Sequence, residues 1–237
     1  PLDLPALLCA MHIEPGAREA REIERLAEKI RAAARPRGIY RIGCIEARNA
    51  DQIKIDGVMF RSRALARSLE GVDRAFPFVV TCGDEVESVS LKKGSVLVAY
   101  WSETIATWIL QAAVGTLQAR VQTRFRLGRT ASMSPGSGEL GVWPIEQQRP
   151  LFALLGDVEG QIGVRLTDRF LMIPRKSLSG LLFPTAYDFH TCQLCRREDC
   201  PARRSPFDGV LWESTYPGTQ PFGVSSPDPA RPTIRNR

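Results

Sequence analysis

One long apolar stretch constrains the fold of this chain more than any other feature. Residues 95–119 combine aliphatic, aromatic and alanine side chains with few charges. A helix this apolar is unsuited to a surface position with one face in water, so the stretch is predicted to be the central helix of the core. Its expected core residues are Val96, Tyr100, Ile105, Trp108, Ile109, Ala112, Ala113 and Leu117.

Shorter segments add both helices and strands. Residues 17–34 place Ile23, Leu26 and Ile30 on one helical face with charges on the other, which predicts an amphipathic helix. Residues 76–81 are β-branched and aromatic and predict a buried strand. Further helices are predicted at 62–70 and 144–155, a short strand and glycine-rich loop at 129–141, and strands at 162–167, 170–173 and 179–183. Together these elements predict a mixed α and β protein.

Composition excludes several classes. The 237 residues are 43% hydrophobic and 24% charged, as in a soluble globular protein. No stretch approaches the roughly 20 apolar residues that cross a bilayer, and no basic segment precedes the short apolar run at the start, so a cytoplasmic protein without a membrane partner is expected. The net charge is +6, but Lys and Arg are scattered among acidic residues, so no nucleic-acid partner is expected. The proline-rich tail from Tyr216 is expected to lie on the surface or to be disordered.

Three closely spaced cysteines point to metal chemistry. Cys192, Cys195 and Cys200 lie in polar, basic sequence, where neighbouring arginines favour thiolates. Three thiolates at this spacing predict an iron–sulfur cluster or a zinc site. His190 would complete a Cys3His zinc site. A cluster would instead take a distant thiol, for which Cys82, Cys44 and Cys9 are the candidates, or would leave one iron open. A disulfide or three unrelated surface cysteines are the alternatives.

The second half of the chain resembles a known family. The residues that carry the resemblance are Ser134–Gly136, Trp143–Arg149, Leu151–Leu155, Ile162–Gly163, Leu166–Thr167, Met172–Pro174 and Ser177–Gly180. In order and spacing they look like the activation (reactivation) domain of cobalamin-dependent methionine synthase, and some free-standing members of that family also carry a C-terminal cysteine run. The resemblance implies one α+β domain, a bent antiparallel sheet with flanking helices, that binds S-adenosylmethionine beside a corrinoid.

The same resemblance implies a set of site residues. Ser134, Pro135, Gly136 and Gly138 would form a loop that contacts the adenosyl or methionyl group, although a structural turn is the alternative. Ser177 and Ser179 would lie near the cofactor at a strand entrance, or would satisfy backbone groups there.

The chain also departs from the family pattern. Ser132 and Ser137 stand where the family has Arg and Tyr, so Arg129 is the candidate for the carboxylate contact. In the long helix, Trp101 and Trp108 fall near two acidic positions of the family and leave Glu103 as the remaining carboxylate. With Trp143, these tryptophans would stack on an adenine or corrin face, or would belong to the core.

The implied function is an accessory one. The protein would help to activate a corrinoid-dependent methyltransferase reductively, by docking on the corrinoid-binding methyltransferase or corrinoid protein that presents the cobalamin. A flavodoxin- or ferredoxin-type donor would supply electrons. The alternatives are a docking module that has lost S-adenosylmethionine, and a small iron–sulfur or zinc metalloprotein. The expected ranges are 1–125 and 126–190 for the two parts of the activation-like domain, and 191–237 for the cysteine motif and tail.

Overall fold

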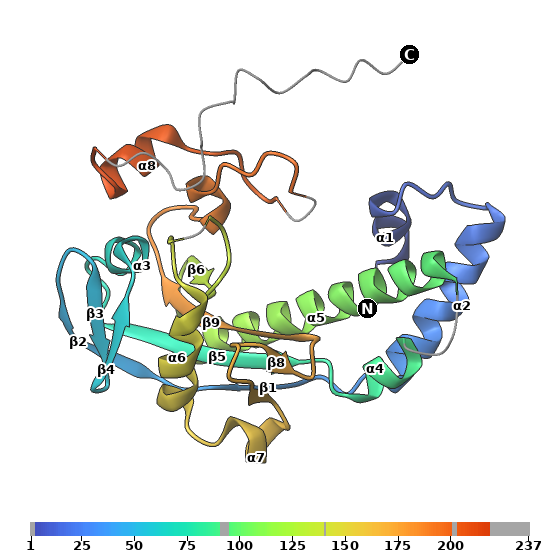
Figure 1. The fold of residues 1–237 in the computed structure, drawn as a ribbon, viewed down its shortest axis with the longest axis horizontal. Coiled ribbons are helices and arrows are strands. Elements are labelled where there is room, and N and C mark those ends of the chain that lie inside the picture. Colours follow the sequence, from blue (N-terminus) through green and yellow to red (C-terminus); the bar gives the residue numbers. More distant parts are fainter. Residues whose placement is uncertain (1–2, 91–94, 140, 201–202, 219–237) are drawn as a thin grey trace.

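An antiparallel sheet organises the fold (Figure 1). The structure is a computed structural model that describes residues 3–90, 95–139, 141–200 and 203–218. Within those residues, a seven-stranded sheet has the order β4-β3-β2-β5-β9-β6, and β1 also pairs with β5. All of its pairings are antiparallel. The strands are β1 (Arg37–Tyr40), β2 (Gly43–Arg48), β3 (Gln52–Ile55), β4 (Val58–Arg61), β5 (Arg74–Thr81), β6 (Thr130–Met133) and β9 (Ser177–Pro184). A separate pair joins β7 (Arg165–Leu166) to β8 (Met172–Ile173).

Helices flank the sheet on both faces, which confirms the predicted α+β class (Figure 1). On one face lie α1 (Leu4–Ala10), α2 (Arg18–Ala33), α4 (Glu85–Ser90) and α5 (Val96–Phe125). On the other lie α3 (Arg63–Ser68), α6 (Gln148–Leu155) and α7 (Val158–Ile162). Two short 3₁₀ helices, η1 (Ile145–Gln147) and η2 (Thr191–Leu194), and the helix α8 (Gly209–Thr215) complete the described elements.

The central strand β5 separates two hydrophobic cores. Alternate side chains of a strand point to opposite faces of its sheet. Phe76 and Phe78 therefore pack with α5 and α2, whereas Ala75 and Val79 pack with α3 and α6. Because both faces are covered, β5 is buried along almost its whole length, which explains the continuous apolar run of the predicted strand at 76–81.

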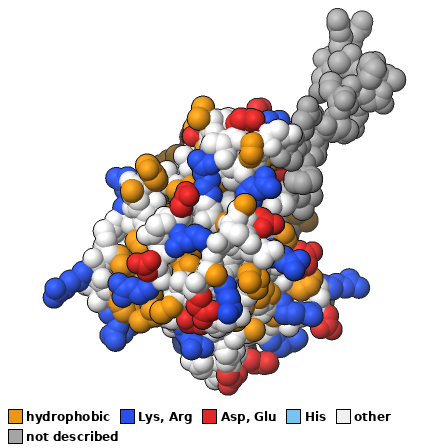
Figure 2. Space-filling view, turned by 90° about the vertical axis from the view of Figure 1, so that its left-hand side faces the viewer, with side chains coloured by type: hydrophobic (Ala, Val, Ile, Leu, Met, Phe, Trp, Pro, Cys, Tyr) orange, Lys and Arg blue, Asp and Glu red, His pale blue; other side chains and the backbone are white. Residues whose placement is uncertain are grey.

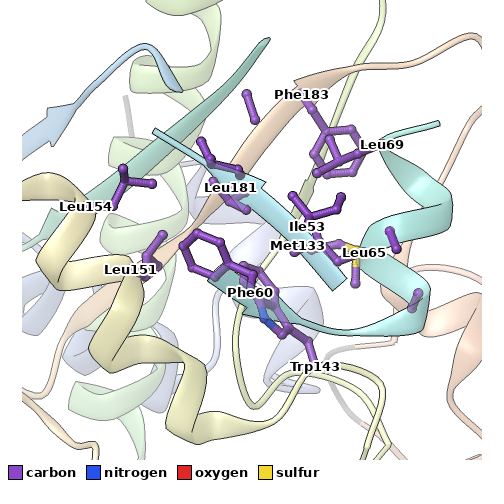
Figure 3. Close-up of a cluster of buried hydrophobic side chains, with 14 of the residues drawn as sticks. Ile53, Phe60, Leu65, Leu69, Met133, Trp143, Leu151, Leu154, Leu181 and Phe183 are labelled. Carbon is purple, nitrogen blue, oxygen red and sulfur yellow. The ribbon is translucent and has the colours of Figure 1, made fainter. Parts of the chain in front are cut away.

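The core on the α6 side is built around aromatic side chains (Figure 3). Phe60 and Trp143 lie edge to face with ring centroids 6.2 Å apart, and Leu151 of α6 lies near Phe60. Met133 of β6 and Leu181 of β9 belong to the same cluster. This core therefore joins the sheet to the loop that follows β6.

The helix α5 confirms the predicted long helix, but it packs one side against a core and exposes the other, so it is not the enclosed helix that was predicted. Ser95 caps its start by accepting a hydrogen bond from Val98 N at 3.3 Å, and Arg126, with φ of 50°, ends it. Three of the eight expected core residues are exposed: Val96 is 89% exposed, Tyr100 is 52% exposed, and Ala112 also faces water. Ile105 and Ile109 are buried, whereas Trp108, Ala113 and Leu117 are half-buried. A helix of this length spans about 45 Å, whereas an eight-residue strand spans about 27 Å. The first turns of α5 therefore extend beyond the sheet.

Several other elements differ from the predictions. The predicted strand at 162–167 shrinks to β7, because Asp157 accepts a hydrogen bond from Gly160 N at 2.8 Å and starts α7 in the preceding residues. Gly163, with φ of 73°, ends that helix. The short strands β1 to β4 and the helix α8 were not predicted. The predicted proline-rich tail lies outside the described residues from position 219 on.

Charges of both signs share the face drawn in Figure 2. Lys and Arg side chains lie between Asp and Glu side chains there, with scattered hydrophobic side chains, so the described part of this face has no basic stripe. Among the described residues, no helix has both the length and the apolar character needed to cross a bilayer.

Candidate functional site

A cleft of about 710 Å³ lies between the long helix and the cysteine-bearing segment. Its walls are the middle of α5, the strand β6, the loop at 134–138 and the segment at 188–204, which runs beside β6 in Figure 1. We call it the glycine-loop cleft, and we call the described part of 188–204 the cysteine segment. The cleft brings together residues from three distant parts of the chain.

The loop at 134–138 is a tight turn. Ser137 donates from its backbone N to the Ser134 carbonyl at 3.1 Å, with Pro135 and Gly136 between them. Gly136 has φ of 79°, so the turn has the type II pattern that needs glycine at this position. A Cβ on Gly136 would lie 2.4 Å from Ile145 Cδ1, so a larger residue would also require the Ile145 side chain to move. The predicted structural turn is therefore present, and it forms part of the cleft wall.

Gly138 brings the loop close to the cysteine segment. It has φ of 89°, and a Cβ there would lie 3.0 Å from Thr191 Cγ2. Glu139 accepts a hydrogen bond from Arg196 N at 3.2 Å. The loop and the cysteine segment are therefore in direct contact across one end of the cleft.

A polar stripe of α5 forms the opposite wall. Gln111, Gly115 and Gln118 line the cleft at helical spacing. Gln118 donates from Nε2 to Ser132 Oγ at 3.3 Å, and Gln111 Oε1 accepts from Arg204 Nη2 at 2.7 Å. Among the described residues, a Cβ on Gly115 would have no neighbour within 4 Å outside the helix's own nearby backbone, so this position is open. The sequence analysis missed this stripe, although its spacing on an otherwise apolar helix was a usable signal.

The cysteine segment is held by one guanidinium. Arg203 Nη1 donates to the carbonyls of Cys192 at 3.4 Å and Ser205 at 2.9 Å. Its Nη2 donates to the carbonyls of Cys195 at 2.9 Å and Arg197 at 2.7 Å. These four bonds fold the segment around Arg203 and fix its backbone against the cleft.

Aromatic contacts tie the cysteine segment to α8. The Arg196 guanidinium lies 5.1 Å from the Phe207 ring centroid and 6.0 Å from that of Trp212. Asp208 N donates to the Gln193 carbonyl at 2.9 Å. The segment is therefore packed between α8 and the cleft.

The three cysteines of the run reach the cleft but do not form a metal centre. Cys192, Cys195 and Cys200 all line it, as does His190. Within the described residues, however, no three His, Cys, Asp or Glu side chains converge closely enough to hold a metal ion. The residues as placed do not fit a zinc ion or an iron–sulfur cluster, so the predicted metal site stays a prediction of the sequence.

The distant thiols do not join this group. Cys82 is fully buried under α5, with Sγ 3.7 Å from the Ala106 carbonyl. Cys9 lies in α1 and Cys44 in β2, and neither lines the cleft. The structure therefore places none of the three candidates for a fourth cluster ligand beside the cysteine segment.

Burial raises the pKa of the Cys82 thiol to about 11, against the opposing charge of Lys176. The folded protein thus holds this proton more tightly than the unfolded chain, whose thiol has a pKa of about 8.5. The resulting stability is present below the unfolded pKa and is lost as pH rises through about 11. We expect urea unfolding at pH 8 and pH 10.5 to show a larger loss of stability for the wild type than for Cys82→Ala. Equal losses would contradict this prediction, and Cys44→Ala, at an exposed thiol, is the control.

Three other predicted site residues lie outside the cleft. Ser177 and Ser179 pair with Thr81 and Val79, which places them on the α6 side of β9, and Ser177 Oγ donates to the Pro174 carbonyl at 2.7 Å. Arg129 lines a separate hollow of about 1100 Å³ and donates to the Ala186 carbonyl at 3.4 Å. The structure therefore brings the loop residues and the cysteines together, but not these three.

The tryptophans and Glu103 also lie outside the cleft wall, in the two cores and in an ion pair. Trp143 is buried in the core on the α6 side of the sheet. Trp101 is buried in the core on the α5 side, and Trp108 is partly buried against that same core. Burial alone would raise the pKa of Glu103, but hydrogen bonds and charges from Lys176 and Arg175 lower it below its ordinary value. Glu103 is therefore an ion-pair partner, at 2.8 Å from Lys176 Nζ.

The sheet order, the long helix and the flanking helices define an α+β activation-domain fold. A similar fold is seen in the crystal structure of the MetH reactivation domain bound to AdoHcy (S-adenosylhomocysteine). The TM-score is 0.58 at 18% sequence identity, over 92% of this chain and 86% of that one. At this identity the likeness shows the fold alone. No family model matches the chain, and no curated protein matches it significantly.

Proposed function

We propose that this protein binds an S-adenosyl compound in the glycine-loop cleft and assists the reductive activation of a cobalamin-dependent methyltransferase. The observation that carries the proposal is the position of the Ser134–Gly136 turn, which lines a cleft between α5, β6 and the cysteine segment. The fold likeness to a reactivation domain with bound AdoHcy supports it independently.

The cleft suits a ligand of this size and chemistry. Its volume of about 710 Å³ lies within the range of roughly 300–1,000 Å³ that is usual for small-molecule sites. Hydroxyl, amide and backbone groups of the loop, Ser132 and α5 offer hydrogen bonds to a ribose and an adenine edge. Arginines of the cysteine segment offer positive charge to a carboxylate.

In the proposed role, the partner supplies the corrinoid. A corrinoid-binding methyltransferase or corrinoid protein would present its cobalamin at the mouth of the cleft, and a flavodoxin- or ferredoxin-type donor would supply the electron. When S-adenosylmethionine is bound, its sulfonium supplies the methyl group. The residues of this chain would bind and orient that ligand.

The test of the proposal is direct binding of AdoHcy and S-adenosylmethionine to the purified protein by calorimetry, with ATP as the control nucleotide. We expect saturable binding of both S-adenosyl compounds with dissociation constants in the micromolar range, about −8 kcal/mol, and much weaker binding of ATP. An absence of binding at millimolar ligand would overturn the proposal and would favour a docking module that has lost this ligand.

The metalloprotein alternative has its own experiment. Anaerobic purification, followed by iron, zinc and acid-labile sulfide analysis, compares the wild type with Cys195→Ala. Because the described thiols do not converge, we expect less than one equivalent of metal in both proteins. Stoichiometric metal that is lost in Cys195→Ala would contradict this expectation and would support the iron–sulfur or zinc site predicted from the sequence.

A further inference from the structure

Arginines gather in the glycine-loop cleft, and none of them has an acidic partner among the described residues. Arg197, Arg203 and Arg204 all line it. The ion pairs formed among the described residues involve other side chains. Asp188 is the only carboxylate among the described residues of the cleft wall, and its Oδ1 lies 3.7 Å from His190 Nε2. The cleft therefore has an excess of positive charge, which favours an anionic ligand group.

Two of these arginines, Arg203 and Arg204, are oriented by side-chain hydrogen bonds, and the two have different roles. Arg203 is part-buried and its two terminal nitrogens serve four backbone carbonyls, so its role is to hold the cysteine segment. Arg204 donates from Nη2 to a neutral partner, Gln111 Oε1, at 2.7 Å. A guanidinium carries five N–H donors, and a neutral amide leaves its charge uncompensated. Arg204 is thus a cation that is oriented across the cleft but not neutralised.

The strand side of the cleft supplies no such charge. Ser132 of β6 faces the cleft with a hydroxyl that accepts from Gln118 Nε2. Arg129, the candidate from the sequence, lies before β6 and lines the other hollow. A hydroxyl does not replace the two parallel bonds that a guanidinium makes to a carboxylate. The charge must therefore come from the cysteine segment.

We propose that Arg204, oriented by Gln111 and carried by the segment that Arg203 holds, binds the α-carboxylate of the S-adenosyl ligand. This inference rests on the proposed function and deepens it, because it assigns the specificity for the amino-acid half of the ligand to one residue. It also makes the cysteine segment part of the binding site rather than an appendage of the domain.

The experiment compares two ligands, one with and one without the amino-acid group that carries the carboxylate. AdoHcy carries an α-carboxylate, whereas 5′-methylthioadenosine keeps the adenosine and sulfur but lacks the amino-acid group. In Arg204→Gln we expect the dissociation constant for AdoHcy to rise about 10- to 100-fold, the range for a lost charge-assisted contact. Binding of 5′-methylthioadenosine should change less than about twofold. Arg204→Lys keeps the positive charge but loses the planar guanidinium that makes two parallel bonds to a carboxylate. Its dissociation constant for AdoHcy should therefore lie between those of the wild type and Arg204→Gln.

Two further variants make the comparison specific. Arg120→Gln removes an exposed cation from α5 outside the cleft wall, and it should leave the affinity for both ligands unchanged. Arg129→Gln tests the rival residue, and we expect no effect on AdoHcy. Thermal unfolding of each variant shows whether it is folded.

Each other outcome overturns the inference in a recognisable way. Unchanged AdoHcy affinity in Arg204→Gln, or an equal loss for both ligands, would show that Arg204 does not contact the carboxylate. A selective loss of AdoHcy in Arg129→Gln would assign the contact to that residue instead. If the wild type binds neither ligand, the proposed function itself fails, whereas the other outcomes leave it standing.

Discussion

Replacing Trp143 by alanine is expected to lower the free energy of unfolding by about 3–5 kcal/mol. The side chain is 1% exposed and lies in the core with Phe60 and Leu151 (Figure 3). Its removal leaves a cavity among the core side chains, which the surrounding residues cannot fill without moving. Urea denaturation should show a lower midpoint with an unchanged slope, because the loss is one of stability and not of cooperativity.

Trp143→Phe is the matched control. Trp143 Nε1 is buried without a hydrogen-bond partner among the described residues, so the indole N–H contributes no bond that phenylalanine would lose. We expect a loss below about 2 kcal/mol for this variant, since most of the ring volume is kept. A loss below about 1 kcal/mol in Trp143→Ala would contradict the assigned core position.

Trp143→Phe also tests the prediction from the sequence that Trp143 stacks on a ligand. If Trp143 stacked on an adenine or corrin face, Trp143→Phe would weaken ligand binding. The ring is buried in the core and does not line the cleft, and the Trp143 carbonyl accepts a hydrogen bond from Gly136 N at 2.8 Å, which Trp143→Phe keeps. We therefore expect unchanged AdoHcy affinity.

The elements that sequence reasoning found are those with strong local patterns. The helix α2 has apolar residues on one face, and α5 is apolar over most of its length. The strand β5 is a continuous apolar run because both of its faces are covered. In each case, the residues of the element itself indicate whether it forms a helix or a strand.

The missed strands have little local signal. The strands β1, β3 and β4 have four residues each, and β3 alternates buried and half-buried positions over that short length only. The pairing of β2 with β3 also shifts register between Ile45 and Ala47. These strands are stabilised by neighbours such as β5, where Arg37 pairs with Thr81, and such non-local pairing is invisible in a short window.

Only the part of the candidate site that depends on local sequence could be predicted. The Ser-Pro-Gly turn is local, and its chemistry predicts its shape. The faces of Ser177 and Ser179 depend on the register of β9, and both faces of that strand are apolar, since Leu181 and Leu182 serve different cores. Hydrophobic alternation therefore gave no indication of direction. The meeting of Arg204 with Gln111 joins residues 93 positions apart, which only the folded chain reveals.

A large side chain at Gly115, which would occupy the cleft, is expected to have the largest effect on ligand binding. Glycine inside a helix costs about 0.5–1 kcal/mol relative to alanine. In the part of the chain that the structure describes, no atom within 4 Å would oppose a Cβ at this position, so packing does not require glycine there. The position lines the cleft, which suggests that the open space itself is needed. Gly115→Ala should therefore raise the free energy of unfolding by about 0.5–1 kcal/mol and keep AdoHcy binding.

Gly115→Trp distinguishes an effect on the space for the ligand from an effect on the stability of the fold. Its side chain would extend into the cleft, where the ligand is proposed to lie, so we expect AdoHcy affinity to fall more than about 100-fold, or about 2.7 kcal/mol. The unfolding free energy should not fall below that of the wild type, because the side chain enters open space. Thr116→Trp is the matched control: it carries the same side chain about 100° around the helix, at an exposed position outside the cleft wall. Calorimetric titration of the three variants tests the site directly, since equal affinity in Gly115→Trp and Thr116→Trp would place the ligand elsewhere on the fold.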